Sequence, residues 1–210
     1  DQVSVQLNDT HPAISVAELM RLLVDEEALG WDRAWDICRR TFSYTNHTVL
    51  PEALETWSVD LLGHMLPRHM QIIFEINRRF LDEVDRRHPG RADLLRALSL
   101  IAEGDCKQVR MAHLAIVGSH KVNGVAELHS NILKNRLFRD FHELFPGRFI
   151  NVTNGITPRR WLLQSNPALS ELVTSVIGDG WIMDLDQLEA LAPHAEDPEF
   201  RLRWQEVRRR

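Results

Sequence analysis

The fold class follows from the stretch Val3-Ser4-Val5-Gln6-Leu7-Asn8-Asp9-Thr10-His11-Pro12 near the start of the chain. Its first five residues alternate apolar and polar side chains, which predicts a strand with one buried face. The strand runs directly into Asp9 and His11, and Ser15 and Glu18 then have the spacing of a capping box that begins a helix. A strand, a polar loop and a helix in this order indicate an α/β fold, in which ligands bind at the carboxyl ends of strands.

Helical periodicity dominates the rest of the chain. We expect the longest helix at residues 70–84, after Pro67 in a position that a first helical turn tolerates, and another at residues 122–133. Residues 111–117 are apolar and fit either a strand or a helix, whereas residues 149–152 predict a second strand. Two strands separated by helices imply parallel pairing. Because two strands make a poor sheet, we expect the rest of the sheet to lie outside this sequence.

Composition and charge narrow the class of protein. The 210 residues can bury the core of one large domain or two smaller ones, and 44% hydrophobic with 26% charged residues is typical of soluble globular proteins. The formal net charge of -5 argues against a nucleic-acid or anionic-membrane partner. No apolar run is long enough to span a bilayer. Cys38 and Cys106 are isolated, so we expect reduced, buried thiols in a cytoplasmic protein.

Both ends of the sequence lead us to expect a piece of a longer protein. The chain starts within about one residue of the first predicted strand, and it stops at Arg208-Arg209-Arg210 inside a charged helical pattern. Natural domains more often begin and end in loose polar linkers.

Three polar loops carry the candidate chemistry. They are Gln6-Leu7-Asn8-Asp9-Thr10-His11-Pro12, Thr45-Asn46-His47-Thr48-Val49-Leu50-Pro51-Glu52-Ala53-Leu54-Glu55 and Asn151-Val152-Thr153-Asn154-Gly155-Ile156-Thr157-Pro158. Asn46, His47 and Thr48 can all donate and accept hydrogen bonds, and Gly155 would let a ligand approach the backbone next to Asn154. A neutral carbohydrate needs such groups because each hydroxyl requires a partner. The residues alone predict part of an α/β protein with three loops for a polyhydroxylated ligand.

Each candidate also has a structural interpretation. Asp9 and His11 form either a sugar- or metal-binding pair or a turn in which Asp9 accepts a local hydrogen bond and His11 packs. The Asn154 loop could equally be a plain turn or a domain joint. Residues 118–124 are rich in glycine but lack both nucleotide-binding patterns, so we expect a turn at a helix start. His142-Glu143 lacks the second histidine of a zinc protease.

Read in order, these stretches resemble the glycogen/starch/maltodextrin phosphorylase family over essentially the whole chain. The motifs are Val5-Gln6-Leu7-Asn8-Asp9-Thr10-His11-Pro12, Tyr44-Thr45-Asn46-His47-Thr48-Val49-Leu50-Pro51-Glu52-Ala53-Leu54-Glu55, Leu66-Pro67-Arg68-His69, Gly118-Ser119-His120, Val122-Asn123-Gly124-Val125-Ala126 and Thr153-Asn154-Gly155-Ile156-Thr157-Pro158-Arg159-Arg160-Trp161. The resemblance implies a helix-rich α/β fragment of a glycosyltransferase B-type fold, which has two Rossmann-like domains. Residues 1–157 would form the C-terminal part of the N-terminal domain, and residues 158–210 the opening helices of a truncated C-terminal domain that holds the cofactor.

The resemblance also implies an activity. The family transfers the terminal glucose of an α-1,4-glucan (glycogen, starch or maltodextrin) to inorganic phosphate with retained configuration, using pyridoxal phosphate. None of Lys107, Lys121 and Lys134 resembles the lysine that anchors this cofactor, and the basic residues that hold phosphate lie later in the family's sequences. We therefore expect the isolated chain to be inactive, with no cofactor bound. The parent enzyme would be a cytoplasmic homodimer, with no nucleic-acid or membrane partner.

Individual roles follow from the same resemblance. His47 would be the catalytic residue, with its side chain on the terminal glucose and its backbone carbonyl facing the positive charge that develops there. Asn154 would hold the 6-hydroxyl of that glucose, and Trp161 would lie close to the cofactor. No metal is implied. The substrate-binding residues would be Asp9, His11, Asn46, Thr48, Glu52 and Asn154.

Two other functions stay open on the sequence. A non-catalytic glucan-binding module could use the same loops. A metal-dependent hydrolase could use Asp9, His11 and His47, although a metal site normally requires further ligands.

Overall fold

A computed structural model of the chain describes residues 3–50 and 54–209. The chain divides into two compact units, Asp1–Thr153 and Asn154–Arg210. This division lies close to the boundary expected after residue 157. The assignment of the two units to the two domains of a parent enzyme stays a prediction.

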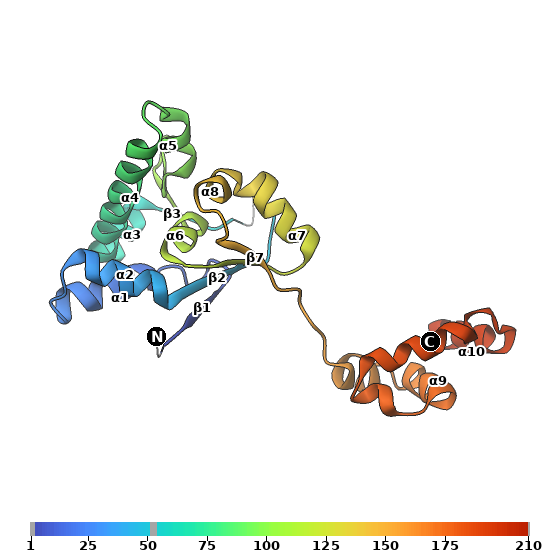
Figure 1. Ribbon diagram of the computed structural model, residues 1–210. Helices are drawn as coiled ribbons and strands as arrows, with labels where there is room; N and C mark the ends of the chain where they lie inside the picture. The colour runs from blue at the N-terminus through green and yellow to red at the C-terminus, as the bar shows by residue number, and fades with distance from the viewer. Residues whose placement is uncertain (1–2, 51–53, 210) are drawn as a thin grey trace. The chain divides into compact units, whose positions relative to one another are not determined.

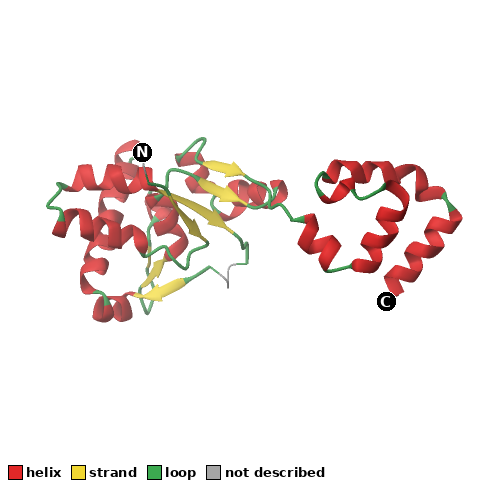
Figure 2. Ribbon diagram, turned by 90° about the horizontal axis from the view of Figure 1, so that it is seen from below, coloured by secondary structure: helices red, strands yellow, loops and turns green. Residues whose placement is uncertain are grey.

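The first unit is built on a parallel sheet of four strands in the order β1-β2-β6-β7 (Figures 1 and 2). The strands are β1 (Val5–Asn8), β2 (Phe42–Asn46), β6 (Val122–Gly124) and β7 (Phe149–Asn151). Leu7 pairs with Tyr44, Tyr44 with Val122, and Val122 with Phe149, so one row of buried side chains crosses the sheet. The helix-rich α/β class with parallel pairing is confirmed. Because the strands are parallel, all four carboxyl ends lie at one edge of the sheet.

Helices separate these strands along the chain, and a small antiparallel sheet interrupts them. The helical elements are α1 (Ser15–Arg21), η1 (Leu22–Glu26), α2 (Trp31–Thr41), α3 (Val59–Met65), α4 (Pro67–Arg87), α5 (Ala92–Leu98), α6 (Met111–Gly118), α7 (Glu127–Ile132), η3 (Leu133–Leu137) and α8 (Arg139–Leu144). The second sheet has the order β3-β5-β4, from β3 (Thr56–Ser58), β5 (Gln108–Arg110) and β4 (Ile101–Ala102). The predicted helix at residues 70–84 is confirmed as part of α4, which begins at Pro67.

Helix α6 forms the centre of the core, where it contacts β2, α1 and α2. All its residues are buried except His113, which is partly buried. A helix that is apolar on every side has no 3.6-residue periodicity, which explains why residues 111–117 fitted either a strand or a helix. Burial also raises the pKa of the Cys38 thiol to about 12. Cys106, which we expected to be buried, is exposed.

Four local predictions were wrong. The parallel sheet contains four strands among the described residues rather than two, and residues 122–133 begin with β6 before α7 starts at Glu127. Helix α1 begins at Ser15 itself, so Ser15 caps nothing and Ile14 is the N-cap. The turn before it already bonds the backbone, because the Ser15 amide donates to the Pro12 carbonyl over 2.9 Å. We also expected the apolar side chains on one face of the first strand to be buried. Only Leu7 is buried, since β1 is an edge strand.

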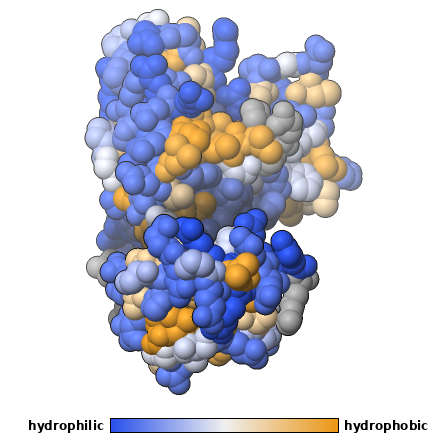
Figure 3. Space-filling view, turned by 90° about the vertical axis from the view of Figure 1, so that its right-hand side faces the viewer, coloured by the Kyte–Doolittle hydropathy of each residue, from blue (hydrophilic) through white to orange (hydrophobic). Residues whose placement is uncertain are grey.

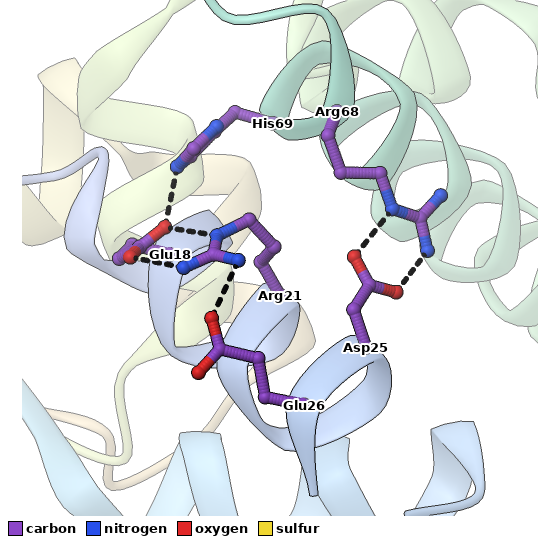
Figure 4. A network of polar contacts seen from close by, with 6 residues as sticks. All are labelled: Glu18, Arg21, Asp25, Glu26, Arg68 and His69. Atoms are coloured by element: carbon purple, nitrogen blue, oxygen red, sulfur yellow. Dashed lines mark hydrogen bonds and ion pairs between the residues drawn. The ribbon is translucent and has the colours of Figure 1, made fainter. Parts of the chain in front are cut away.

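Glu18, freed from a capping role, ties two helices together instead (Figure 4). Its carboxylate accepts hydrogen bonds from Arg21 on the same helix, at 2.8 Å, and lies 2.6 Å from His69 Nε2 on α4. The bond from Arg21, with His69 as a smaller contributor, lowers the pKa of Glu18 to about 2. Beside it, Arg68 donates to Asp25 over 2.6 and 2.7 Å. The start of α4 is thereby held against α1 and η1.

The second unit consists of helices, as predicted for the end of the chain (Figure 1). They are η4 (Arg159–Gln164), α9 (Pro167–Ile177), η5 (Gly180–Ile182), η6 (Leu185–Glu196) and α10 (Pro198–Arg209). Its buried apolar side chains include Leu172, Val173 and Trp181, and the Trp181 indole donates to Thr174 Oγ1 over 3.1 Å. Among the described residues of the whole chain, no helix has the length and apolarity to cross a membrane.

Candidate functional site

Asp9 ties the loops after β1 and β2 together at the carboxyl edge of the sheet. Its Oδ1 accepts from the Thr10 amide over 2.7 Å, the local bond expected for a turn. Its Oδ2 accepts from the His47 amide over 3.1 Å, and the Asp9 amide donates to the Thr45 carbonyl over 2.9 Å. Asp9 has a φ of 62°, in the left-handed region that asparagine and aspartate tolerate better than other side chains. Asp9 therefore forms the local turn after β1 and, through the same carboxylate, joins this loop to the loop after β2.

Glu55 makes a second connection between the same two loops. Its Oε2 accepts from the Thr10 hydroxyl over 2.8 Å and lies 3.6 Å from His11 Nδ1. Its Oε1 accepts from the Trp57 indole over 2.8 Å. Thr10 is buried, whereas the His11 side chain is 80% exposed. Asp9 of the first loop and Glu55 of the second thus each bond the other loop, and the His11 side chain faces solvent.

His47 itself is exposed. It lies between Asn46 and Thr48, whose side chains accept hydrogen bonds from backbone amides of the same loop. The Thr48 hydroxyl accepts from the Leu50 amide over 3.3 Å. The structure thus brings Asp9, His47 and Thr48 together. Glu52 lies outside the described residues. Leu50 after β2 and Val152 after β7 are exposed apolar side chains at this polar edge. On the face drawn in Figure 3, several apolar patches interrupt a mostly hydrophilic surface.

Asn46 is fully buried, unlike His47 beside it. Its Nδ2 donates to the Tyr44 hydroxyl over 2.9 Å, and its Oδ1 accepts from the Thr48 amide over 3.1 Å. The same Oδ1 lies 2.9 Å from Nε2 of His129 on α7. Both ends of the amide that we expected to bind substrate are therefore engaged by the protein itself.

Sequence reasoning did not single out Tyr44 or the contact of His129 with Asn46. Tyr44 follows the alternation of β2, where Phe42, Tyr44 and Asn46 are buried, a signal that a strand prediction could have used. His129 lies 83 residues from Asn46 in the sequence, and no local pattern connects them.

Asn154 and Trp161 belong to the second unit, where both side chains are exposed. Asn154 precedes the first helical element of that unit, and Trp161 lies on η4. Their predicted roles stay predictions.

The chain is similar in sequence to known proteins. A sequence model of the family described as carbohydrate phosphorylase matches residues 1–210. The chain belongs to the carbohydrate phosphorylase family. It is 57% identical to a glycogen phosphorylase of Synechocystis sp. over 209 residues, 56% identical to that of Chlamydia trachomatis over 208 residues, and 58% identical to the human muscle form over 200 residues. These alignments cover 100%, 99% and 95% of this chain but 25%, 26% and 24% of the relatives. The resemblance seen in the motifs is confirmed.

Two of the three lysines of this phosphorylase segment already engage oxygen atoms of this chain. A lysine that forms an imine with this cofactor needs an amine available in an active-site pocket. Lys107 is exposed and lies 3.0 Å from Glu103, and Lys121 is exposed and donates to the Gly147 carbonyl over 2.8 Å. Lys134 is half-buried on η3. Among the described residues there is also no group of three His, Cys, Asp or Glu that could hold a metal ion.

Proposed function

We propose that this chain is part of an α-1,4-glucan phosphorylase and supplies one wall of its glucose-binding site. The observation that carries the proposal is the hydrogen bond between the His47 amide and Asp9, which locks two polar loops at the carboxyl edge of a parallel sheet. That edge is where α/β proteins bind ligands. The relatives named glycogen phosphorylase support the same reading.

In this proposal the parent enzyme transfers the terminal glucose of the glucan to phosphate and retains its configuration. The exposed His47 side chain bonds a hydroxyl of that glucose, and the His47 carbonyl faces the charge that develops as the bond breaks. Catalysis of this kind depends on positioned dipoles that need not reorganise. The residues proposed to line the channel are Asp9, His11, Thr48, Glu52 and Asn154, with Asn154 on the 6-hydroxyl.

The remaining parts of the proposal concern the parent enzyme. Residues 1–157 belong to its N-terminal domain and residues 158–210 open its C-terminal domain, in a glycosyltransferase B-type fold. Pyridoxal phosphate is anchored by a lysine outside this sequence, and Trp161 is the residue of this chain that lies close to it. The parent works as a cytoplasmic homodimer on glucan and phosphate.

Replacement of His47 tests the role of the loop. In the full-length enzyme that carries this segment, we expect His47→Ala to lower kcat/KM for phosphorolysis of maltoheptaose by about a hundredfold, a size typical for the loss of one transition-state contact. His88→Ala is the matched control, because His88 is exposed at the end of α4. Equal rates for the two variants would contradict the proposal.

The isolated chain should be inactive, because in this proposal the lysine that anchors the cofactor lies outside it. We expect no imine absorption band after addition of pyridoxal phosphate and no release of glucose 1-phosphate from maltoheptaose. An imine band together with glucose 1-phosphate would contradict this expectation. Maltoheptaose binding by the isolated chain, combined with an inactive full-length enzyme, would favour a glucan-binding module instead.

A further inference from the structure

We propose that His129 is a positioning residue for the loop that carries His47 and that it acts through the buried amide of Asn46. Its effect on turnover rests on the proposed function, whereas its effect on the loop can be tested in this chain alone. The residue lies on α7, which contacts β6 and β7 in the same sheet.

The orientation of the Asn46 amide follows from its partners. The backbone amide of Thr48 can only donate, so the atom 3.1 Å from it must be the carbonyl oxygen Oδ1. The nitrogen Nδ2 then faces the Tyr44 hydroxyl at 2.9 Å, which can accept. Burial raises the pKa of the Tyr44 phenol, so this partner stays neutral. The reverse orientation would place an NH2 group against the Thr48 amide.

The orientation of Asn46 in turn decides which nitrogen of His129 carries a proton. Oδ1 accepts but cannot donate, and it lies 2.9 Å from His129 Nε2. Nε2 must therefore carry the proton that is shared with Asn46. Oδ1 thus accepts from His129 and from Thr48 at the same time, and its position depends on both.

The two amides that flank the exposed His47 side chain are consequently held by different parts of the fold. The His47 amide is bonded by Asp9 from the loop after β1, and the Thr48 amide is bonded by Asn46. Without His129, the buried Oδ1 loses one of its two donors, and the Asn46 side chain is no longer tied to α7. In a buried network, a partly satisfied group costs more than the average hydrogen bond contributes. His129 therefore influences the loop without touching a ligand.

The first test uses the unmodified chain. Nitrogen NMR of histidine-labelled protein, with the His129 signal assigned from its loss in His129→Gln, reports which ring nitrogen carries the proton. We expect a proton on Nε2. A neutral ring protonated on Nδ1 alone would overturn the proposal.

The second test compares His129→Leu with His129→Gln, because the glutamine NH2 can still donate to Asn46. In the leucine variant of this chain, hydrogen exchange of the Thr48 amide should be faster by tenfold or more. This is about the effect of losing one net hydrogen bond. The glutamine variant should recover most of the protection. The His47 amide, held by Asp9, is the internal reference. Unchanged Thr48 exchange in the leucine variant would overturn the proposal.

The third test measures phosphorolysis in the full-length enzyme. We expect His129→Leu to lower kcat by roughly ten- to a hundredfold, the range for misplaced reacting groups, with KM for maltoheptaose changed by less than about twofold, and His129→Gln to restore most of the rate. An unchanged kcat for the leucine variant would overturn the catalytic part. If the unmodified full-length enzyme itself shows no phosphorolysis, the proposed function fails, while the first two tests still decide the positioning role.

Discussion

At the scale of single residues, His113 illustrates how burial governs protonation. Its Nδ1 lies 2.9 Å from the Ser99 carbonyl, so this nitrogen donates. The ring packs edge-on against Phe141 and Phe138, with centroids 4.8 and 6.4 Å away. Burial, reinforced by the charge of Arg110, lowers the pKa of His113 to about 4. The folded protein therefore keeps this imidazole neutral where the unfolded chain would protonate it.

This difference predicts an acid-sensitive contribution to stability. Between the unfolded pKa of 6.5 and the folded pKa of about 4, the unfolded state binds more protons. The contribution is complete above about pH 6.5 and is lost as the pH falls to 4, by at most about 3 kcal/mol. Urea unfolding at pH 7 and pH 4.5 should show a smaller pH dependence for His113→Phe than for the unmodified chain. His88→Phe, at an exposed site, should leave the dependence unchanged.

The positions of candidate residues could be predicted from the sequence where a motif contained them. Asp9 and His47 lie in polar loops that the sequence marks plainly, and the structure does place them at one edge of the sheet. The burial of Asn46 could not be foreseen in the same way. It depends on the last residue of β2 meeting His129 on α7, a contact made by pairing distant segments. Local patterns carry no information on such pairing.

At the scale of elements, Gly124 shows how closely β6 and α7 approach each other. A Cβ added at Gly124 would lie 2.3 Å from Ser130 Oγ and 2.8 Å from Ser130 Cα. The second of these atoms belongs to the backbone and cannot rotate away. Ser130 is itself held by hydrogen bonds from its hydroxyl to the Ala126 carbonyl and Asn151. Any side chain at position 124 must therefore push α7 away from the sheet.

We expect Gly124→Ala to lower the free energy of unfolding by about 1–3 kcal/mol, as overpacking of a rigid site does. Gly63→Ala is the matched control, because Gly63 lies in α3 and an added Cβ there meets no atom within 4 Å. That change should be neutral or stabilise by up to about 1 kcal/mol. Urea denaturation of both variants measures the difference. Similar stabilities would show that α7 can shift without cost.

Elements could be predicted where they are long and periodic. Helix α4 has 21 residues with a continuous apolar stripe, and its start at Pro67 follows from simple stereochemistry. Strand β6 has three residues, too few for alternation to be distinguished from helical spacing. Only its neighbours β2 and β7, which pair with it on both sides, make it a strand. Short central strands of this kind depend on tertiary structure rather than on local sequence.

At the scale of the whole molecule, the two units differ in how much apolar surface they bury. The first unit has a continuous core that extends from α1 through α6 to α8. In the second unit the buried apolar side chains include Leu172, Val173 and Trp181, while Trp161 and Met183 are 65% and 82% exposed. A helical segment of this length with so small a core is only marginally stable.

The two units should therefore behave differently when expressed separately. We expect residues 1–153 to unfold in one cooperative thermal transition. We expect residues 154–210 alone to lose helical circular dichroism gradually, without a sharp transition. A steep, two-state melt of residues 154–210 would contradict this prediction.

The bonds around His47 have a thermodynamic consequence for any ligand. The backbone amides of this segment donate to the side chains of Asp9, Asn46 and Thr48. The segment therefore has little backbone entropy left to lose when a ligand binds. A ligand bound there would meet a rigid surface and would spend none of its binding free energy on ordering it. The unfavourable entropy of association should then come mainly from the ligand and from other parts of its binding site, rather than from the His47 segment.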